Sequence, residues 1–217
     1  MDNLRNLNRL REGIDKVWIL QNGKNTQHLF YDYLQQINFC IQDLNAEYGH
    51  INDFTRKEVV YCIALTDWIQ EAMKKIEKCI RPDVLHGFVY KEETLLREYE
   101  KYLKALRSLA VAHPLSTDRH QSFGFNGDII CVDIHTKTPQ LAHTDWYYHF
   151  DERGVINEYK STDNFYLIAY SRNIKDSQFQ IAIGGNIKTL IKTAQLYIDK
   201  LYALNRYLKQ QKKRDFI

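Results

Sequence analysis

The 217-residue sequence lacks CxxC pairs, long uninterrupted apolar runs, and the P-loop, dinucleotide-binding, HExxH and serine-elbow motifs of common enzymes. Its four cysteines, Cys40, Cys62, Cys79 and Cys131, stand far apart. Their spacing indicates small buried side chains rather than a zinc or redox motif. A membrane helix needs roughly 18 consecutive apolar residues, so none is expected. Because charges also interrupt the N-terminal stretch, we expect no signal peptide, no membrane partner and a cytoplasmic protein.

Hydrophobic residues make up 44% of the chain, which is enough for a substantial core. The net charge of +3 is too small to indicate nucleic-acid binding by itself. Basic residues nevertheless gather near the C-terminus: Lys188, Lys192, Lys200, Arg206, Lys209, Lys212, Lys213 and Arg214. They are typical either of a nucleic-acid surface or of a solvated helix end that favours cations.

Apolar residues recur at three- and four-residue steps in five segments, which predicts five amphipathic helices. The first runs from Leu4 to about Gly23, and the second from about Asn25 to just before Gly49. The third follows a capping box at Thr55 and ends near Pro82. The fourth covers residues 91–113, and the last begins after Asn186 as its N-cap.

Between the fourth and last helices the pattern changes to aromatic and β-branched runs separated by turn residues. The runs "DIICVDI", "TDWYYHF", "VINEY" and "FYLIAYS" predict strands, with "DERG" as a hairpin loop between the second and third. We therefore expect a mainly α fold. We expect residues 1–217 to form one domain, a bundle of about five helices with a small antiparallel β-meander of three or four strands inserted at about 123–171.

The segment "RSLAVAH" places Arg107 and His113 where the fourth helix is expected to end. On an ideal helix the two side chains would be about 120° apart and would not share a face. Arginine can curl around a helix flank, however, and Pro114 pushes His113 out of helical geometry. A guanidinium can hold a phosphate, and an imidazole can move a proton to or from a ribose oxygen. The pair therefore suits metal-free RNA cleavage, provided that a second acid or base is present.

This segment resembles the motif of the HEPN superfamily, in which four to six residues separate Arg from His near the end of a helix in a helical bundle. The resemblance implies a HEPN-like homodimer in which the motifs of two subunits face each other. It also implies a metal-independent ribonuclease of toxin–antitoxin or phage-defence systems, with Arg107 on the scissile phosphate and His113 as general acid or base. No cofactor or metal is then expected, and RNA and an antitoxin or defence protein are the expected partners. Other family members bind RNA or nucleotides without cleavage.

Ser108 follows Arg107 where the family often has a more strongly polar residue. Ser108, Asp118, Arg119 and His120 are candidate supporting residues at the same rim. The alternative interpretation is structural. In it Arg107 pairs with a carboxylate such as Glu100, and His113 caps the last helical carbonyls. A non-catalytic module that binds RNA, a nucleotide or a protein partner also stays open.

The β region offers two further hypotheses. His135, His143, Asp145 and His149 could ligate a metal ion in a hydrolase, or could simply be exposed strand residues. Its aromatic residues could stack unpaired RNA bases, or could bury one sheet face against helices.

Overall fold

The computed structural model describes residues 3–7, 24–49, 54–111, 128–136, 146–151, 154–156, 163–172 and 178–214. Within these residues the chain is mainly helical and carries a β-sheet, as the sequence predicts. The chain divides into two compact units. The first combines Met1–Gly49, Leu65–Leu96 and Ile191–Ile217, and the second combines His50–Ala64 and Arg97–Leu190. One domain over residues 1–217 stays a prediction.

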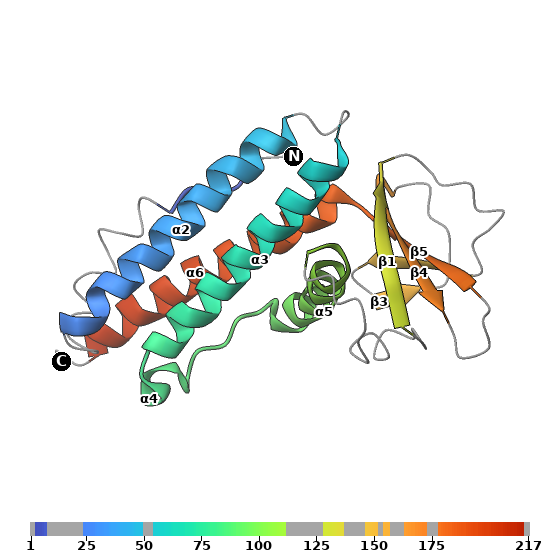
Figure 1. The fold of residues 1–217 in the computed structure, drawn as a ribbon. Helices are drawn as coiled ribbons and strands as arrows, with labels where there is room; N and C mark the ends of the chain where they lie inside the picture. Colours follow the sequence, from blue (N-terminus) through green and yellow to red (C-terminus); the bar gives the residue numbers. More distant parts are fainter. Residues whose placement is uncertain are drawn as a thin grey trace. The chain divides into compact units, whose positions relative to one another are not determined.

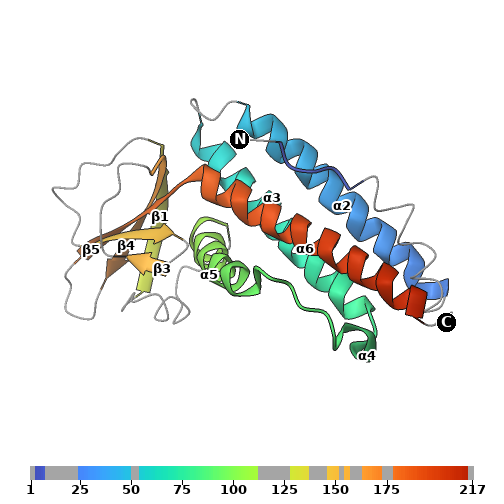
Figure 2. The same ribbon diagram turned by 180° about the vertical axis from the view of Figure 1, so that it is seen from behind.

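Long helices make up the first unit: α2 (Lys24–Tyr48), most of α3 (Arg56–Cys79) and most of α6 (Ile187–Arg214). They lie side by side (Figures 1 and 2). Each buries an apolar stripe. The buried side chains include Phe30, Leu34, Ile37 and Leu44 of α2, Ile69, Met73 and Ile76 of α3, and Leu201, Leu204 and Leu208 of α6. Among the described helices, none has the length and apolar character needed to cross a bilayer.

Local hydrogen bonds place the helix ends close to where the sequence predicts them. The Thr55 backbone N–H donates to the Glu58 carboxylate at the start of α3, which is one half of the expected capping box. The Asn186 side-chain oxygen accepts from the Lys188 N–H at 2.8 Å, which confirms the N-cap of α6. Helix α5 (Glu93–Ala110) ends shortly before Pro114.

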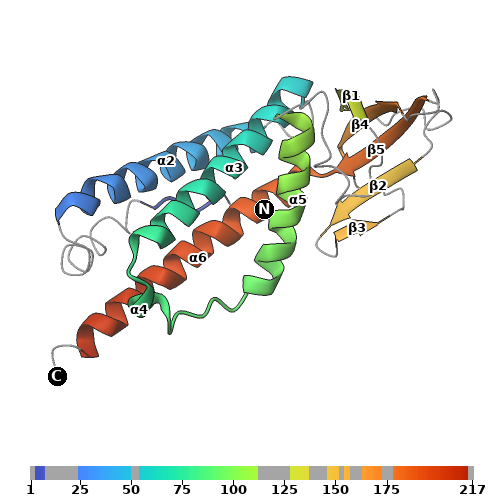
Figure 3. The same cartoon turned by 60° about the horizontal axis from the view of Figure 1, so that its bottom comes forward.

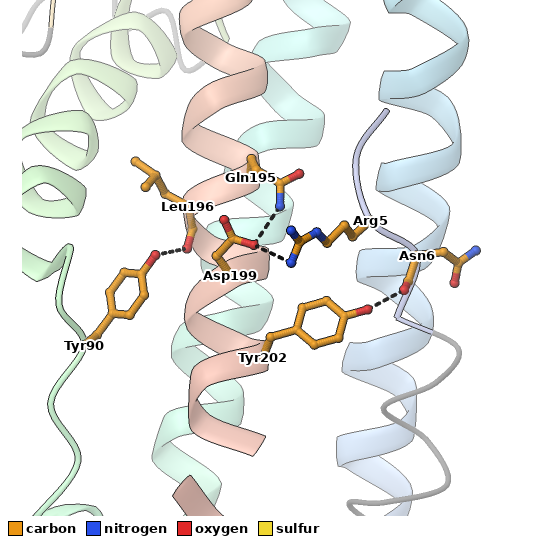
Figure 4. A network of polar contacts seen from close by, with 7 residues as sticks. All are labelled: Arg5, Asn6, Tyr90, Gln195, Leu196, Asp199 and Tyr202. Carbon is orange, nitrogen blue, oxygen red and sulfur yellow. Dashed lines mark hydrogen bonds and ion pairs between the residues drawn. The ribbon is translucent and has the colours of Figure 1, made fainter. Parts of the chain in front are cut away.

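The prediction for the first helix is wrong at its start, because residues 3–7 are not helical. The Leu4 N–H donates to Asn45 and the Leu7 N–H donates to Asn38, each at 2.9 Å and each to a side chain of α2. Leu4 and Leu7 are buried there, so these contacts replace the intrahelical bonds. Figure 4 shows part of this segment beside α6. Residues 8–23 of the predicted helix lie outside the described residues.

Tyrosines hold the connection between α3 and α5 against α6. This connection contains the short helix α4 (Pro82–Leu85) (Figure 3). The Tyr207 hydroxyl donates to the Val84 carbonyl at 2.9 Å, and the Tyr90 hydroxyl donates to the Leu196 carbonyl at 3.2 Å. The Phe88 and Tyr207 rings lie 5.5 Å apart. The connection is therefore a packed part of the first unit.

The second unit contains the sheet, whose described strands are β1 (Asp128–His135), β2 (Trp146–Asp151), β3 (Gly154–Ile156), β4 (Phe165–Arg172) and β5 (Gln178–Gly185). Their spatial order is β1-β4-β5-β2-β3. The β1–β4, β4–β5 and β2–β3 pairs are antiparallel, whereas β2 and β5 are parallel. Helix α5, from Arg97 onward, lies beside this sheet in all three ribbon views.

The four predicted strands and the β2–β3 hairpin are confirmed, but the simple meander is wrong. The described sheet has a fifth strand, β5, beyond the predicted boundary at 171, and it contains a parallel pair. Alternation of apolar and polar residues indicates that a run forms a strand. It does not indicate which strand lies beside it, because the pattern is the same for any neighbour. Pairing order was therefore not readable from the local pattern.

The junction between β5 and α6 is closely packed. Asn164 accepts a hydrogen bond from the Ile187 N–H through its side chain, and its own N–H donates to the Gly185 carbonyl, both at 3.0 Å. A Cβ atom on Gly185 would lie 2.3 Å from Cζ of the buried Phe165 ring. Glycine is therefore required where the sheet passes into the last helix.

The cysteine prediction holds where the structure describes the side chains. Cys40 and Cys62 are buried and Cys79 is half-buried, and all three are free thiols. Burial raises the pKa of Cys40 to about 11 and also raises that of Cys79. The Cys40 and Cys79 thiols are therefore protonated near neutral pH.

Candidate functional site

Arg107 lies in the last turn of α5, with its side chain exposed. The neighbouring Leu106 and Leu109 are buried, at 0% and 1% exposure, so the helix turns its apolar face inward and leaves Arg107 on the outer face. The Val111 N–H donates to the Arg107 carbonyl at 3.0 Å in the turn that closes the helix. A cation at this end also suits the helix dipole.

Ser108 is half-buried on the same turn. His113, Asp118, Arg119 and His120 lie outside the described residues. The structure therefore places two of the six predicted site residues, both on one helix end, and the approach of His113 to Arg107 stays a prediction.

Tyr102 anchors the middle of α5 in the second unit. Its side chain is 1% exposed. Burial raises the pKa of Tyr102, and the charge of the nearby Asp163 carboxylate raises it further. Tyr102 therefore packs in the interior of the second unit, close to a residue just before β4. The inner face of α5 is thus packed as far as the turn that carries Arg107.

A second polar cluster, not predicted as a unit, joins α3 to β1. One Asp133 carboxylate oxygen lies 3.0 Å from Nη1 of Arg56, and the other lies 3.1 Å from Nε2 of His135. The first oxygen also accepts from the Ile134 N–H at 2.9 Å. All three side chains are 42–61% exposed, so water screens these polar contacts and their net contribution to stability is small.

The spacing of Asp133 and His135 could have suggested this contact, because residues two apart on a strand share a face. Arg56 could not have been found in this way, since it is 77 positions away in the chain. The cluster orients the imidazole of His135 and leaves it accessible. Among the described contacts that define it, the cluster holds one histidine, one carboxylate and one guanidinium, and no Ser, Cys or Thr nucleophile.

The metal hypothesis for the β region gains no support from the described residues. They contain no group of three potential ligands among His, Cys, Asp and Glu. His143 and Asp145 lie outside the described residues, as does the side chain of His149. The side chains of the β2 aromatics also lie outside them, so base stacking stays a prediction.

The basic residues of α6 differ in their surroundings. Lys188, Lys192, Arg206 and Lys209 are exposed. Lys200 is instead 12% exposed and lies 2.9 Å from Glu77 and 3.0 Å from Glu93. Burial alone would lower the pKa of Lys200, but the bonds and charges of the two glutamates outweigh it and raise that pKa. Lys200 is therefore part of an internal ion cluster, and a nucleic-acid surface on α6 stays a prediction.

Comparison of the chain with protein-family models, with curated proteins and with solved structures finds no match.

Proposed function

We propose that this chain is a metal-independent endoribonuclease of the HEPN type, in which two subunits each contribute Arg107 and His113 to one site. The proposal includes a cytoplasmic homodimer that acts in phage defence or as a toxin held by an antitoxin. Ser108, Asp118, Arg119 and His120 are the proposed supporting residues at the rim. The proposal rests on the resemblance of "RSLAVAH" to the HEPN motif and on the helical architecture around it.

The observation that carries the proposal is the exposed position of Arg107 at the end of α5. A guanidinium buried in the bundle could not reach a phosphodiester. Here the helix buries Leu106 and Leu109 and presents the arginine three residues before its last residue, Ala110. The following six positions, 108–113, lead to His113, close enough along the chain for one rim to hold both.

The proposed reaction is an internal transesterification. The ribose 2′-oxygen forms a bond to the adjacent phosphorus while a base takes its proton, and the bond from phosphorus to the 5′-oxygen breaks as an acid gives that oxygen a proton. The products are a 2′,3′-cyclic phosphate and a 5′-hydroxyl. One His113 serves as base and the His113 of the second copy as acid, while Arg107 neutralises the charge that grows on the phosphoryl oxygens.

The test compares cleavage of a generic single-stranded RNA by wild type, Arg107→Ala and His113→Ala, with EDTA in every reaction. We expect either substitution to slow cleavage by about 10²- to 10⁴-fold, the usual contribution of a positioned acid or base. Lys104→Ala is the matched control, because Lys104 is an exposed cation on the same helix. It should change the rate by less than about twofold, a surface effect. Absence of cleavage by the wild type, or full activity of both variants, contradicts the proposal.

A non-catalytic binding module is the second candidate, and Ser108 favours it. The half-buried serine is less able than the strongly polar residue common in the family to assist at the phosphate. In this case RNA, a nucleotide or a protein partner binds without being changed. A gel assay that saturates with intact RNA distinguishes the two functions. Arg107→Ala should then weaken RNA binding and lower the salt dependence by about one phosphate contact.

A further inference from the structure

The solvent-facing side of α6 in the first unit carries a row of polar side chains. The row recurs at every third or fourth position, which is one face of an α-helix, and it is about 25 Å long. Its members are exposed or half-buried: Lys192, Gln195, Asp199, Tyr202, Arg206 and Lys209. We call this row the α6 stripe. A partner that approaches this face of α6 from solvent meets these side chains first.

One carboxylate, that of Asp199, stands in the α6 stripe, and residues 3–7 place a cation beside it. Nη1 of Arg5 lies 3.6 Å from Oδ1 of Asp199, and the same oxygen accepts from the Gln195 amide at 2.9 Å. Figure 4 shows Arg5 and Gln195 both directed at this carboxylate. Because the Arg5 side chain is 66% exposed, its charge also faces solvent. Four cations, Arg5 and the three basic members of the stripe, thus stand against one carboxylate.

Tyr202 adds an aromatic ring to the α6 stripe. The side chain is half-buried, and its hydroxyl donates to the Asn6 carbonyl at 2.7 Å, which fixes the ring in place. Arg206 follows one helical turn later. Tyrosine rings stack on unpaired bases, and guanidinium groups bind phosphates and stack on bases. An aromatic ring among cations therefore suits a single-stranded nucleic acid better than an acidic protein segment, which has carboxylates but no bases.

An anionic membrane is a poorer fit to the α6 stripe. A helix that lies in a membrane interface presents an apolar face to the lipid. The large apolar side chains of α6 are instead buried, as at Leu201, Leu204 and Leu208. Among the described residues, the exposed large apolar side chains lie outside α6: Leu29, Phe39, Trp68, Val89 and Val111. The stripe therefore offers charge without the apolar anchors that hold a helix in lipid.

We propose that the α6 stripe binds the backbone of a single-stranded RNA, with the Tyr202 ring stacked on one unpaired base. Its basic side chains, together with Arg5, contact the phosphates. This surface lies on another helix than Arg107, so it goes beyond the cleavage site proposed above. RNA binding by the stripe requires neither Arg107 nor a cleavage step.

The test measures binding of a fluorescent 2′-O-methyl RNA of mixed sequence to the full chain. This probe has no free 2′-hydroxyl, so the proposed transesterification cannot cleave it. Anisotropy titrations are repeated at stepped salt concentrations. The stripe variant carries Lys192→Ala, Arg206→Ala and Lys209→Ala. It should bind about 100-fold more weakly at 0.1 M salt, with a salt slope smaller by about 2, because each lost phosphate contact removes about 0.7 from that slope.

The matched control variant carries Lys57→Ala, Lys75→Ala and Lys78→Ala. These three lysines are exposed on one helix, α3, and their replacement changes the net charge by the same amount. The control should bind within about twofold of wild type, because charges farther than about 10 Å from the RNA are screened at 0.1 M salt. Equal weakening by the two triple variants would show that net charge alone governs binding, and would overturn the proposal.

Single substitutions test the carboxylate and the ring. Asp199→Asn removes the carboxylate but keeps an acceptor for Gln195, so RNA should bind about threefold more tightly, an effect that misfolding cannot produce. Tyr202→Ala should weaken binding about tenfold with an unchanged salt slope, because a stacked base is lost and no phosphate contact is. Tyr202→Phe keeps the ring and should bind like wild type. Weaker binding by Asp199→Asn, or full binding by Tyr202→Ala, contradicts the assigned roles.

Two results overturn the proposal as a whole. One is a lack of saturable probe binding by folded wild type, and the other is wild-type binding by the stripe variant. Vesicles of anionic phosphatidylserine that bind wild type when the probe does not would assign the stripe to a membrane instead. Cleavage is scored separately on ordinary RNA. Probe binding through the stripe without any cleavage contradicts only the ribonuclease proposal, whereas cleavage that depends on Arg107 and His113 but not on the stripe contradicts only the stripe.

Discussion

At Gly185 the sheet leaves no room for a methyl group. The Phe165 ring is fully buried, and three of its atoms lie within 3.0 Å of the position that a Cβ would take. Gly185→Ala must therefore displace the Phe165 ring, which is enclosed by the packed core. We expect a loss of about 3 kcal/mol in the free energy of unfolding, at the upper end of overpacking effects, measured by urea denaturation followed by circular dichroism.

A double substitution isolates the cause. By itself, Phe165→Leu lowers the free energy of unfolding. It also removes the ring atoms that a methyl group at position 185 would meet. Gly185→Ala should thus cost clearly less in the Phe165→Leu background, with a coupling energy of about 1 kcal/mol or more. Additive losses would show that the Phe165 ring does not set the requirement for glycine at position 185.

Residue-level prediction from the sequence succeeded where the cause is local. The Glu58 and Asn186 helix caps each involve residues two or three positions apart, and such contacts can be read from spacing. The contact of Arg56 with Asp133 could not be read, because folding alone brings the two together. Periodicity predicts that Arg107 lies at a helix end. The residues that would share a site with it depend on tertiary structure, which periodicity does not give.

At the scale of elements, Lys200 joins three helices of the first unit. Its ammonium lies between Glu77 near the end of α3 and Glu93 at the start of α5. The Lys200 side chain is only 12% exposed and is therefore shielded from water. The Glu77 and Glu93 side chains remain partly exposed to water. The single lysine therefore keeps two carboxylates from repelling each other at the place where the helices meet.

Lys200→Met should lower the free energy of unfolding by about 2 kcal/mol, because two partly solvated carboxylates lose their counter-ion. The measurement is urea denaturation at neutral pH. Lys209→Met is the control, since Lys209 is exposed on the same helix, and it should change stability by less than about 0.5 kcal/mol. Adding Glu77→Gln to Lys200→Met should restore part of the loss. Equal effects at positions 200 and 209 would contradict the role assigned to the buried lysine.

Element-level prediction depended on the length and strength of the pattern. Helices α2, α3, α5 and α6 each have 18 residues or more of clear periodicity, and the sequence predicts all four. Strand β5 was missed because its eight residues end in Gly184 and Gly185, which indicate a turn before the helix. Residues 3–7 carry a helical pattern, but Asn38 and Asn45 offer their backbone better bonds.

Across the whole molecule, several titratable groups contribute less to the free energy of unfolding as the pH rises. Burial raises the pKa of Cys40 from 9.0 to about 11, and burial with the nearby charges of Asp199, Glu92 and Glu93 raises that of Tyr90 from 10.0 to about 12. Against the effect of its burial, Glu77 and Glu93 raise the pKa of Lys200. In each case the folded chain keeps a proton that the unfolded chain releases at lower pH.

Stability should therefore fall between pH 9 and pH 12, because in this window the unfolded state binds fewer protons than the folded state. Each pKa unit corresponds to about 1.4 kcal/mol, so Cys40 and Tyr90, whose pKa values are each raised by about two, each contribute a loss on the order of 3 kcal/mol. The measurement is the urea midpoint at stepped pH, with tyrosinate absorbance reporting Tyr90. In Cys40→Ala the midpoint should start lower but decline less steeply from pH 9 to about 11. A wild-type midpoint that stays constant over this range, or an unchanged slope in the variant, would show that the buried thiol does not control alkaline unfolding.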